Sequence, residues 1–137
     1  RIQMIVRGIY CPIFDAKKTK STVKAISIVD EYLEHARVMI FENGGKPQTY
    51  VSSADWMVRN LVHRIEAAVP IKDPALQAEL REIIHIQLRD NVKARILEGE
   101  LANNYVPSDR QKKVRSQIEI FHFLNRKNQN RVATGRH

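Results

Sequence analysis

The sequence lacks several features that would assign it to a specialised class of protein. It holds one cysteine, Cys11, in 137 residues, which excludes an internal disulfide and a zinc site built from several cysteines. With so little cysteine, a cytoplasmic setting is the default expectation. No apolar run approaches about 18 residues, so no transmembrane helix is expected. The phosphate-binding loop G-x-x-x-x-G-K-[ST] is also absent, so side chains would have to hold any bound nucleotide.

The chain also lacks an initiator Met and the charged-then-apolar pattern of a signal peptide. Its first residues, 1–6, already have the composition of a strand, so we expect a piece of a longer protein. Apolar residues make up 43% of the sequence, which is enough for one domain with a core.

Acidic residues are in the minority. Lys and Arg number 23 against 15 Asp and Glu, which gives a formal net charge of +8. Such an excess favours a polyanionic partner: nucleic acid, anionic lipid, a nucleotide or polyphosphate. Charge alone does not choose among them.

Strand and helix signals are mixed along the chain. Short β-prone segments predict strands at 2–9, 23–29, 37–42, 48–52 and 64–69. The turn 43–47, which contains Asn43 and two glycines, joins two of these strands into a hairpin. Short helical turns are expected at 31–34 and after Trp56. We expect Trp56 in the core, with stacking on an adenine as the alternative.

Two longer helices are predicted. Asp73 and Pro74 mark the start of the first, and apolar residues at every fourth position from Leu76 to Ile96 extend it towards Gly99. The second is expected over 111–127. Together these elements predict an α/β fold, a mixed β-sheet flanked by helices, as one domain over 1–128 with a flexible tail over 129–137.

The chemically informative segment is 35–55. His35 and Arg37 are two residues apart at the start of a strand, so both side chains point to one face. The hairpin then returns Ser53 and Asp55 towards that strand's beginning. An imidazole, a guanidinium, hydroxyl groups and a carboxylate at one corner can hold a phosphate. Arg37 could instead pair with Glu42.

The order His35-x-Arg37-x4-Glu42 followed by Ser52-Ser53-Ala54-Asp55 resembles the phospholipase D superfamily signature, H-x-K-x4-D and then G-S-x-N. Arg replaces Lys and Glu replaces Asp, which separates this chain from an ordinary phosphodiesterase half.

Longer strings give a more specific resemblance. The chain resembles the C-terminal, phospholipase D-like domain of the histidine-type bacterial polyphosphate kinases over about residues 2–125. The strings that carry it are Ile5-Val6-Arg7-Gly8, Ile26-Ser27-Ile28-Val29-Asp30, Tyr32-Leu33-Glu34-His35, Phe41-Glu42-Asn43-Gly44-Gly45, Ser52-Ser53-Ala54-Asp55-Trp56-Met57, Arg59-Asn60 and Leu88-Arg89-Asp90-Asn91-Val92-Lys93-Ala94-Arg95.

The resemblance implies reversible transfer of the terminal phosphate of ATP to polyphosphate through a phosphohistidine. That histidine would belong to a preceding domain, so this chain should be inactive alone. The family's ATP-contacting residues fall on Arg7 and His35. The resemblance further implies Mg²⁺ without ligands in this chain, a homo-oligomer, the preceding domains as partners, no specific nucleic acid, and a cytoplasmic or membrane-associated location.

Residue chemistry gives these positions independent support. Arg7 interrupts an apolar run, where a charge is costly unless it is paired or faces a site; a salt bridge to Asp30 or Glu66 is the structural alternative. Arg37 is a further phosphate-binding candidate, and Ser53 and Asp55 could support His35 by fixing its tautomer. Arg59 and Arg64 could line a polyanion path or be solvated. The remaining histidines, His63, His85, His122 and His137, have no metal-ligand spacing.

Two other functions stay open on the sequence. A phosphodiesterase or nuclease half-site completed by dimerisation would hydrolyse diesters without other domains. A non-catalytic basic module would bind DNA or RNA with strong salt dependence, although aromatic residues for base stacking are few at 7%.

Overall fold

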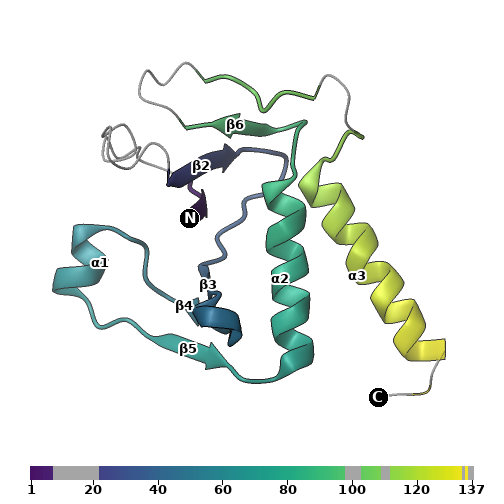
Figure 1. Ribbon diagram of the computed structural model, residues 1–137, viewed down its shortest axis with the longest axis horizontal. Helices are drawn as coiled ribbons and strands as arrows, with labels where there is room; N and C mark the ends of the chain where they lie inside the picture. The colour runs from purple at the N-terminus through teal and green to yellow at the C-terminus, as the bar shows by residue number, and fades with distance from the viewer. Residues whose placement is uncertain (8–21, 98–102, 109–111, 134, 136–137) are drawn as a thin grey trace. The chain divides into compact units, whose positions relative to one another are not determined.

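A computed structural model describes residues 1–7, 22–97, 103–108, 112–133 and 135 (Figure 1). The predicted α/β architecture is confirmed, with two small sheets and three α-helices among these residues. The chain forms two compact units. The first combines Arg1–Leu33 with His85–His137, and the second is the continuous segment Glu34–Ile84. No helix of the described part is long and apolar enough to cross a membrane.

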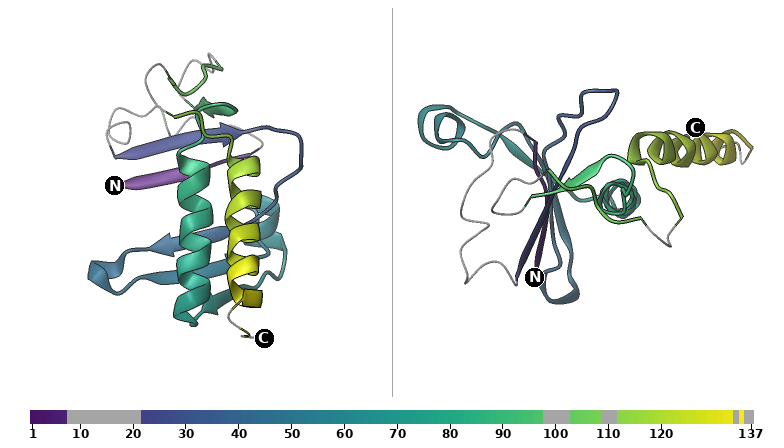
Figure 2. Two further views of the ribbon diagram at one scale, coloured as in Figure 1. Left: turned by 90° about the vertical axis from the view of Figure 1, so that its right-hand side faces the viewer. Right: turned by 90° about the horizontal axis from the view of Figure 1, so that it is seen from above.

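The first unit is built on a mixed sheet of order β1-β2-β6, comprising β1 (Ile2–Ile5), β2 (Val23–Ile28) and β6 (Ala94–Ile96). β1 pairs with β2 in parallel, and β6 pairs with β2 in antiparallel register; β1 and β2 can be followed side by side in Figure 2. Among the described residues, its fully buried apolar side chains are two alanines and two isoleucines: Ala25, Ile28, Ile86 and Ala94.

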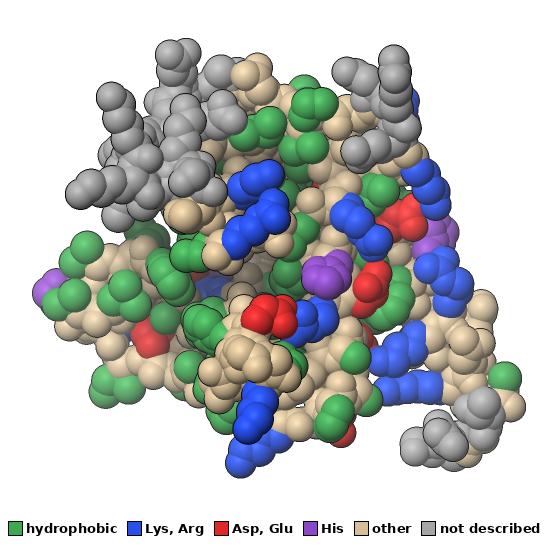
Figure 3. Space-filling model, viewed as in Figure 1, with side chains coloured by type: hydrophobic (Ala, Val, Ile, Leu, Met, Phe, Trp, Pro, Cys, Tyr) green, Lys and Arg blue, Asp and Glu red, His purple; other side chains and the backbone are tan. Residues whose placement is uncertain are grey.

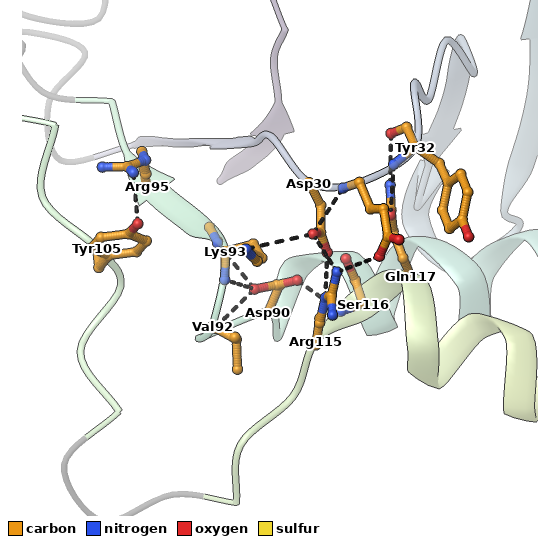
Figure 4. A network of polar contacts seen from close by, with 12 residues as sticks. Asp30, Tyr32, Asp90, Val92, Lys93, Arg95, Tyr105, Arg115, Ser116 and Gln117 are labelled. Atoms are coloured by element: carbon orange, nitrogen blue, oxygen red, sulfur yellow. Dashed lines mark hydrogen bonds and ion pairs between the residues drawn. The ribbon is translucent and has the colours of Figure 1, made fainter.

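A carboxylate organises the connection between the helices and the sheet of this unit. Asp90 is completely buried. Its Oδ1 accepts the backbone N–H groups of residues 92–94 at 2.7 to 3.0 Å, and its Oδ2 accepts the N–H of Ser116 at 2.7 Å (Figure 4). Ser116 is the first residue of α3 (Ser116–Ala133), so Asp90 holds the start of that helix beside the start of β6.

Asp30 forms a second buried polar contact in this unit. Its side chain is 1% exposed and meets the guanidinium of Arg115 in a two-pronged ion pair, with both N–O distances at 2.8 Å. Lys93 Nζ lies 3.7 Å from the same carboxylate (Figure 4). The hydrogen bond from Arg115 lowers the pKa of Asp30. The expected helical turn at 31–34 is wrong, because Asp30 is engaged by Arg115 and the chain continues without helix.

The helix α2 (Pro74–Leu88) begins where the sequence predicts and ends earlier. Asp73 caps it by accepting the N–H groups of Ala75 and Leu76 at 2.8 and 2.9 Å. The predicted continuation to Ile96 is wrong, because Asp90 draws the next backbone N–H groups to its own carboxylate. Residues 94–96 then form β6. By contrast, α3 continues to Ala133, past the expected end at 127.

The second unit contains an antiparallel sheet of order β3-β4-β5, comprising β3 (Val38–Phe41), β4 (Gln48–Ser52) and β5 (Ala68–Ile71). The predicted hairpin is present. Its connection includes a 3₁₀ turn at Asn43–Gly45 whose three residues all have positive φ, as Asn and Gly tolerate. Pro70 was expected to end a strand and instead lies inside β5, paired with Tyr50. β5 is an edge strand, where a missing N–H can face away from the ladder.

The segment between β4 and β5 presents apolar side chains to solvent. It includes α1 (Val58–His63), and hydrophobic side chains gather over this helix in Figure 3. Trp56 is 73% exposed, so its expected place in the core is wrong. Four neighbours are similarly exposed: Val58, Leu61, Val62 and Ile65.

Candidate functional site

The hairpin of the second unit places the candidate site beside the start of β3. Arg37 precedes this strand, and its carbonyl accepts the N–H of Ser52 at 2.9 Å, which extends the β3–β4 pairing by one step. The hydroxyl of Ser52 then accepts the N–H of Ala54 at 3.0 Å and turns the chain as it leaves β4. This local turn brings Asp55 back to Arg37 and His35.

Three side chains meet at this corner. Arg37 Nε donates to Asp55 Oδ1 at 2.7 Å, and Arg37 Nη2 lies 2.9 Å from His35 Nε2. His35 Nε2 also lies 3.2 Å from the same Asp55 oxygen. The His35 side chain is 63% exposed, whereas Arg37 and Asp55 are each 27% exposed. The arrangement therefore leaves the imidazole accessible and holds its two neighbours in place.

The electrostatics of this corner keep Asp55 ionised at neutral pH. The hydrogen bond from Arg37, supported by His35, holds the pKa of Asp55 at about 2, against the opposing effect of partial desolvation. The same contact with Asp55 raises the pKa of Arg37, and the charge of Glu66 acts in the same direction. The suggested pairing of Arg37 with Glu42 is wrong, because Glu42 pairs with Arg81 on α2.

Glu66 lies behind these three side chains, where it contacts Ser53 and Asn60. It was not identified as a site residue from the sequence. Its carboxylate accepts hydrogen bonds from the Ser53 hydroxyl and, at 2.7 Å, from Asn60 Nδ2. These two contacts lower the pKa of Glu66. Ser53 also accepts the N–H of Ala67 at 3.0 Å, so it anchors Glu66 rather than touching His35. The sequence feature that could have identified Glu66 is its place as the single acidic residue in the apolar stretch 65–69.

The other arginine candidates lie on other segments of the chain. Arg59 lies on α1 and Arg64 follows it, and both are exposed. Arg7 belongs to the first unit, two residues beyond β1, and is exposed. Its suggested partners are engaged elsewhere, Asp30 by Arg115 and Glu66 by Ser53 and Asn60. Within the described ranges no ion pair involves Arg7.

The cluster of His35, Arg37 and Asp55 can bind an oxyanion. A guanidinium keeps donors free after one of its N–H groups has been used by Asp55. The imidazole ring can donate or accept a hydrogen bond through its nitrogens. No group of three or more His, Cys, Asp or Glu side chains that could hold a metal ion occurs among the residues that the structure describes.

Comparison with known proteins gives independent evidence of the family to which this chain is similar. Residues 1–117 match the family described as polyphosphate kinase C-terminal domain 2. The chain is 47% identical over 124 residues to a polyphosphate kinase of Vibrio parahaemolyticus, and 47% identical over 123 residues to one of Escherichia coli K12. Each alignment covers 90% of this chain and 18% of the relative.

A solved structure is similar as well. The crystal structure of polyphosphate kinase from Porphyromonas gingivalis superposes with a TM-score of 0.87 at 43% identity, covering 93% of this chain and 20% of that one. The chain thus spans about a fifth of the length of the relatives that it matches.

Proposed function

The chain belongs to the polyphosphate kinase C-terminal domain 2 family, and from that membership we propose that it supplies part of the phosphate site of an ATP:polyphosphate phosphotransferase. The reaction would move the terminal phosphate of ATP reversibly to polyphosphate through a phosphohistidine carried by a preceding domain. ATP, ADP and polyphosphate are the proposed ligands. A cytoplasmic location and assembly into a homo-oligomer belong to the same proposal.

The observation that carries this proposal is the contact of an exposed imidazole with a guanidinium that a carboxylate holds in place. His35 is accessible at 63%, and Arg37 is fixed by Asp55 at 2.7 Å. Phosphoryl transfer requires donors placed where oxygens gain negative charge, with little reorganisation during the reaction. We assign His35 to binding or protonating the transferred phosphate, and Arg37 to neutralising its charge.

Arg7 is assigned to ATP contact on two grounds. It matches the arginine of the family's Ile-Val-Arg-Gly string, and it is an exposed cation with no ion pair to another described residue. Arg59 and Arg64, also exposed, are proposed to guide the polyanion. Mg²⁺ would arrive with the phosphates of ATP, as is usual for this ion.

The test uses a complete polyphosphate kinase that carries this chain as its C-terminal domain. With ATP and Mg²⁺, Arg7→Ala and His35→Ala should each lower the rate of polyphosphate formation by about 100-fold or more, because each removes a group aimed at developing charge. Arg126→Ala, an exposed cation on α3, is the matched control and should retain the wild-type rate.

Two outcomes would contradict this assignment. Wild-type rates in both variants would exclude Arg7 and His35 from the site. Hydrolysis of a phosphodiester by the 137-residue chain alone, abolished by His35→Ala, would favour the phosphodiesterase half-site instead.

A further inference from the structure

His35 Nε2 lies within hydrogen-bonding distance of one donor and one acceptor, which require opposite protonation of this nitrogen. Arg37 Nη2, 2.9 Å away, is always a donor, so it can bond only to a bare Nε2 lone pair. Asp55 Oδ1, 3.2 Å away, is an ionised acceptor, so it can bond only to a protonated Nε2. One nitrogen satisfies one of these contacts at a time.

Two states of the corner follow. In the first, His35 is neutral with its proton on Nδ1, and Nε2 accepts from Arg37. In the second, Nδ1 keeps its proton and Nε2 carries another, so the ring is an imidazolium that donates from Nε2 to Asp55, and Arg37 Nη2 has lost its acceptor. Arg37 does not leave the corner in the second state, because its Nε remains bound to Asp55 at 2.7 Å.

The charges facing His35 decide between these states. Arg37 disfavours a second positive charge beside it, and Asp55 favours one, so the two effects oppose each other. Glu66 acts on Arg37 from the next layer and is itself held by Ser53 and Asn60. An incoming oxyanion changes the balance, since it neutralises Arg37 and gives Nη2 a new acceptor.

Resting on the phosphate site proposed above, we propose that binding of an oxyanion between Arg37 and His35 draws a proton from solvent onto Nε2 of His35. Arg37 transfers its Nη2 hydrogen bond from Nε2 to the anion, and the freed Nε2 lone pair takes up the proton. The new Nε2–H then donates to the anion or to Asp55. One proton is consumed for each anion bound, and no other bond changes.

This coupling gives Asp55 a definite part in the reaction. It is a positioning residue, because it holds the Nε side of Arg37 in both states and offers an acceptor for the new Nε2–H. His35 would become a proton donor only when phosphate is present, so an empty site would not hold an imidazolium beside a guanidinium.

The proton can be observed directly on the 137-residue chain labelled with ¹⁵N at histidine. Imidazole ¹⁵N chemical shifts distinguish a bare from a protonated nitrogen, and loss of one signal set in His35→Gln assigns His35. Sulfate is the probe, because it mimics phosphate and does not itself titrate near neutral pH. Saturating sulfate should convert Nε2 from bare to protonated while Nδ1 stays protonated, which distinguishes uptake of a proton from its transfer between the two ring nitrogens.

Three variants test the parts of the mechanism. Arg37→Gln should weaken sulfate binding about tenfold or more, the effect of losing a charge-assisted hydrogen bond, and should abolish proton uptake. Asp55→Asn should lower both sulfate affinity and the protonated fraction of Nε2. Arg126→Gln removes an equal charge from exposed α3 and should change neither.

The outcomes separate this inference from the proposed function. Sulfate that perturbs His35 while Nε2 stays bare would overturn the proton coupling and leave the phosphate site standing. Proton uptake that persists in Arg37→Gln would also overturn it. If neither sulfate nor tripolyphosphate perturbs His35, the phosphate site itself is refuted, together with the coupling that depends on it.

Discussion

At the scale of single residues, Asp90 shows how one side chain can redirect the backbone. A buried carboxylate must have its oxygens satisfied, and here backbone N–H groups do this on both oxygens. Those groups would otherwise be available to continue a helix. The apolar stripe from Leu76 to Ile96 could not reveal this, because the periodicity of apolar residues does not show where a polar side chain will be buried.

Replacing Asp90 by Asn should destabilise the fold by about 1–3 kcal/mol, because the amide places a donor against one of the N–H groups that the carboxylate accepts. Urea unfolding followed by circular dichroism measures the loss. Asp73→Asn is the matched control, since an exposed cap accepts Asn as readily as Asp. Equal effects of the two substitutions would contradict a special role for Asp90.

The contribution of Asp90 should also depend on pH. Burial raises its pKa, but the N–H groups of Ser116, Lys93 and Ala94 outweigh burial, and the net pKa is lowered from 3.8. A group whose pKa is lower in the folded state stabilises fully above its unfolded pKa. The stability difference between wild type and Asp90→Asn should therefore shrink as pH falls below about 4.

The candidate site was partly predictable at this scale. The i, i+2 spacing and the hairpin placed His35, Arg37 and Asp55 together, because strand alternation and a tight turn are local properties. The partner of Arg37 was not predictable, since Glu42 is nearer in sequence than Asp55 and only the turn after β4 decides between them. Glu66 was missed for the same reason: its partners depend on the path of the chain through α1.

At the scale of elements, the position of the hairpin was predicted closely, because its turn contains residue types that only a few backbone conformations favour. The turn at Asn43–Gly45 has positive φ at three consecutive residues, and Asn and Gly are the residues that adopt positive φ most readily. A strand was predicted at 64–69, whereas β5 spans Ala68–Ile71. The alternation of apolar residues in a short segment does not indicate which neighbour the strand will pair with, so it did not locate the bounds of β5.

Gly44→Ala should destabilise the second unit by about 1 kcal/mol, because φ at this position is +61° and a β-carbon disfavours that conformation. An added Cβ would meet no atom within 4 Å, so backbone strain alone is tested. Thermal unfolding provides the measurement. Gly44→Asn should cost less, because Asn tolerates this region; a larger loss for Asn than for Ala would contradict the explanation.

At the scale of the whole molecule, the fold class was predictable and the division into two units was not. Mixed strand and helix signals are enough to indicate an α/β protein. The first unit, however, joins segments from both ends of the chain, which no local pattern can reveal. The exposure of Trp56 was likewise not predictable, because composition does not distinguish a core from an uncovered surface.

Hydrogen exchange should resolve the two units. Asp90→Asn should accelerate amide exchange in β2 and β6 more than in β3 and β4, because its contacts lie within the first unit. Gly44→Ala should have the opposite distribution. Uniform acceleration across both sheets in either variant would show that the chain opens as a single cooperative body.

The discontinuity of the first unit also sets an order of events during synthesis. A ribosome delivers the chain from the N-terminus, so every strand of the second unit is available once Ile71 has emerged. β2 emerges earlier, but its antiparallel partner β6 follows only at Ala94–Ile96, and the last N–H bound by Asp90 belongs to Ser116. The nascent sheet that begins first is thus completed last, and translation pauses between residues 72 and 96 would prolong the exposure of its unpaired edge.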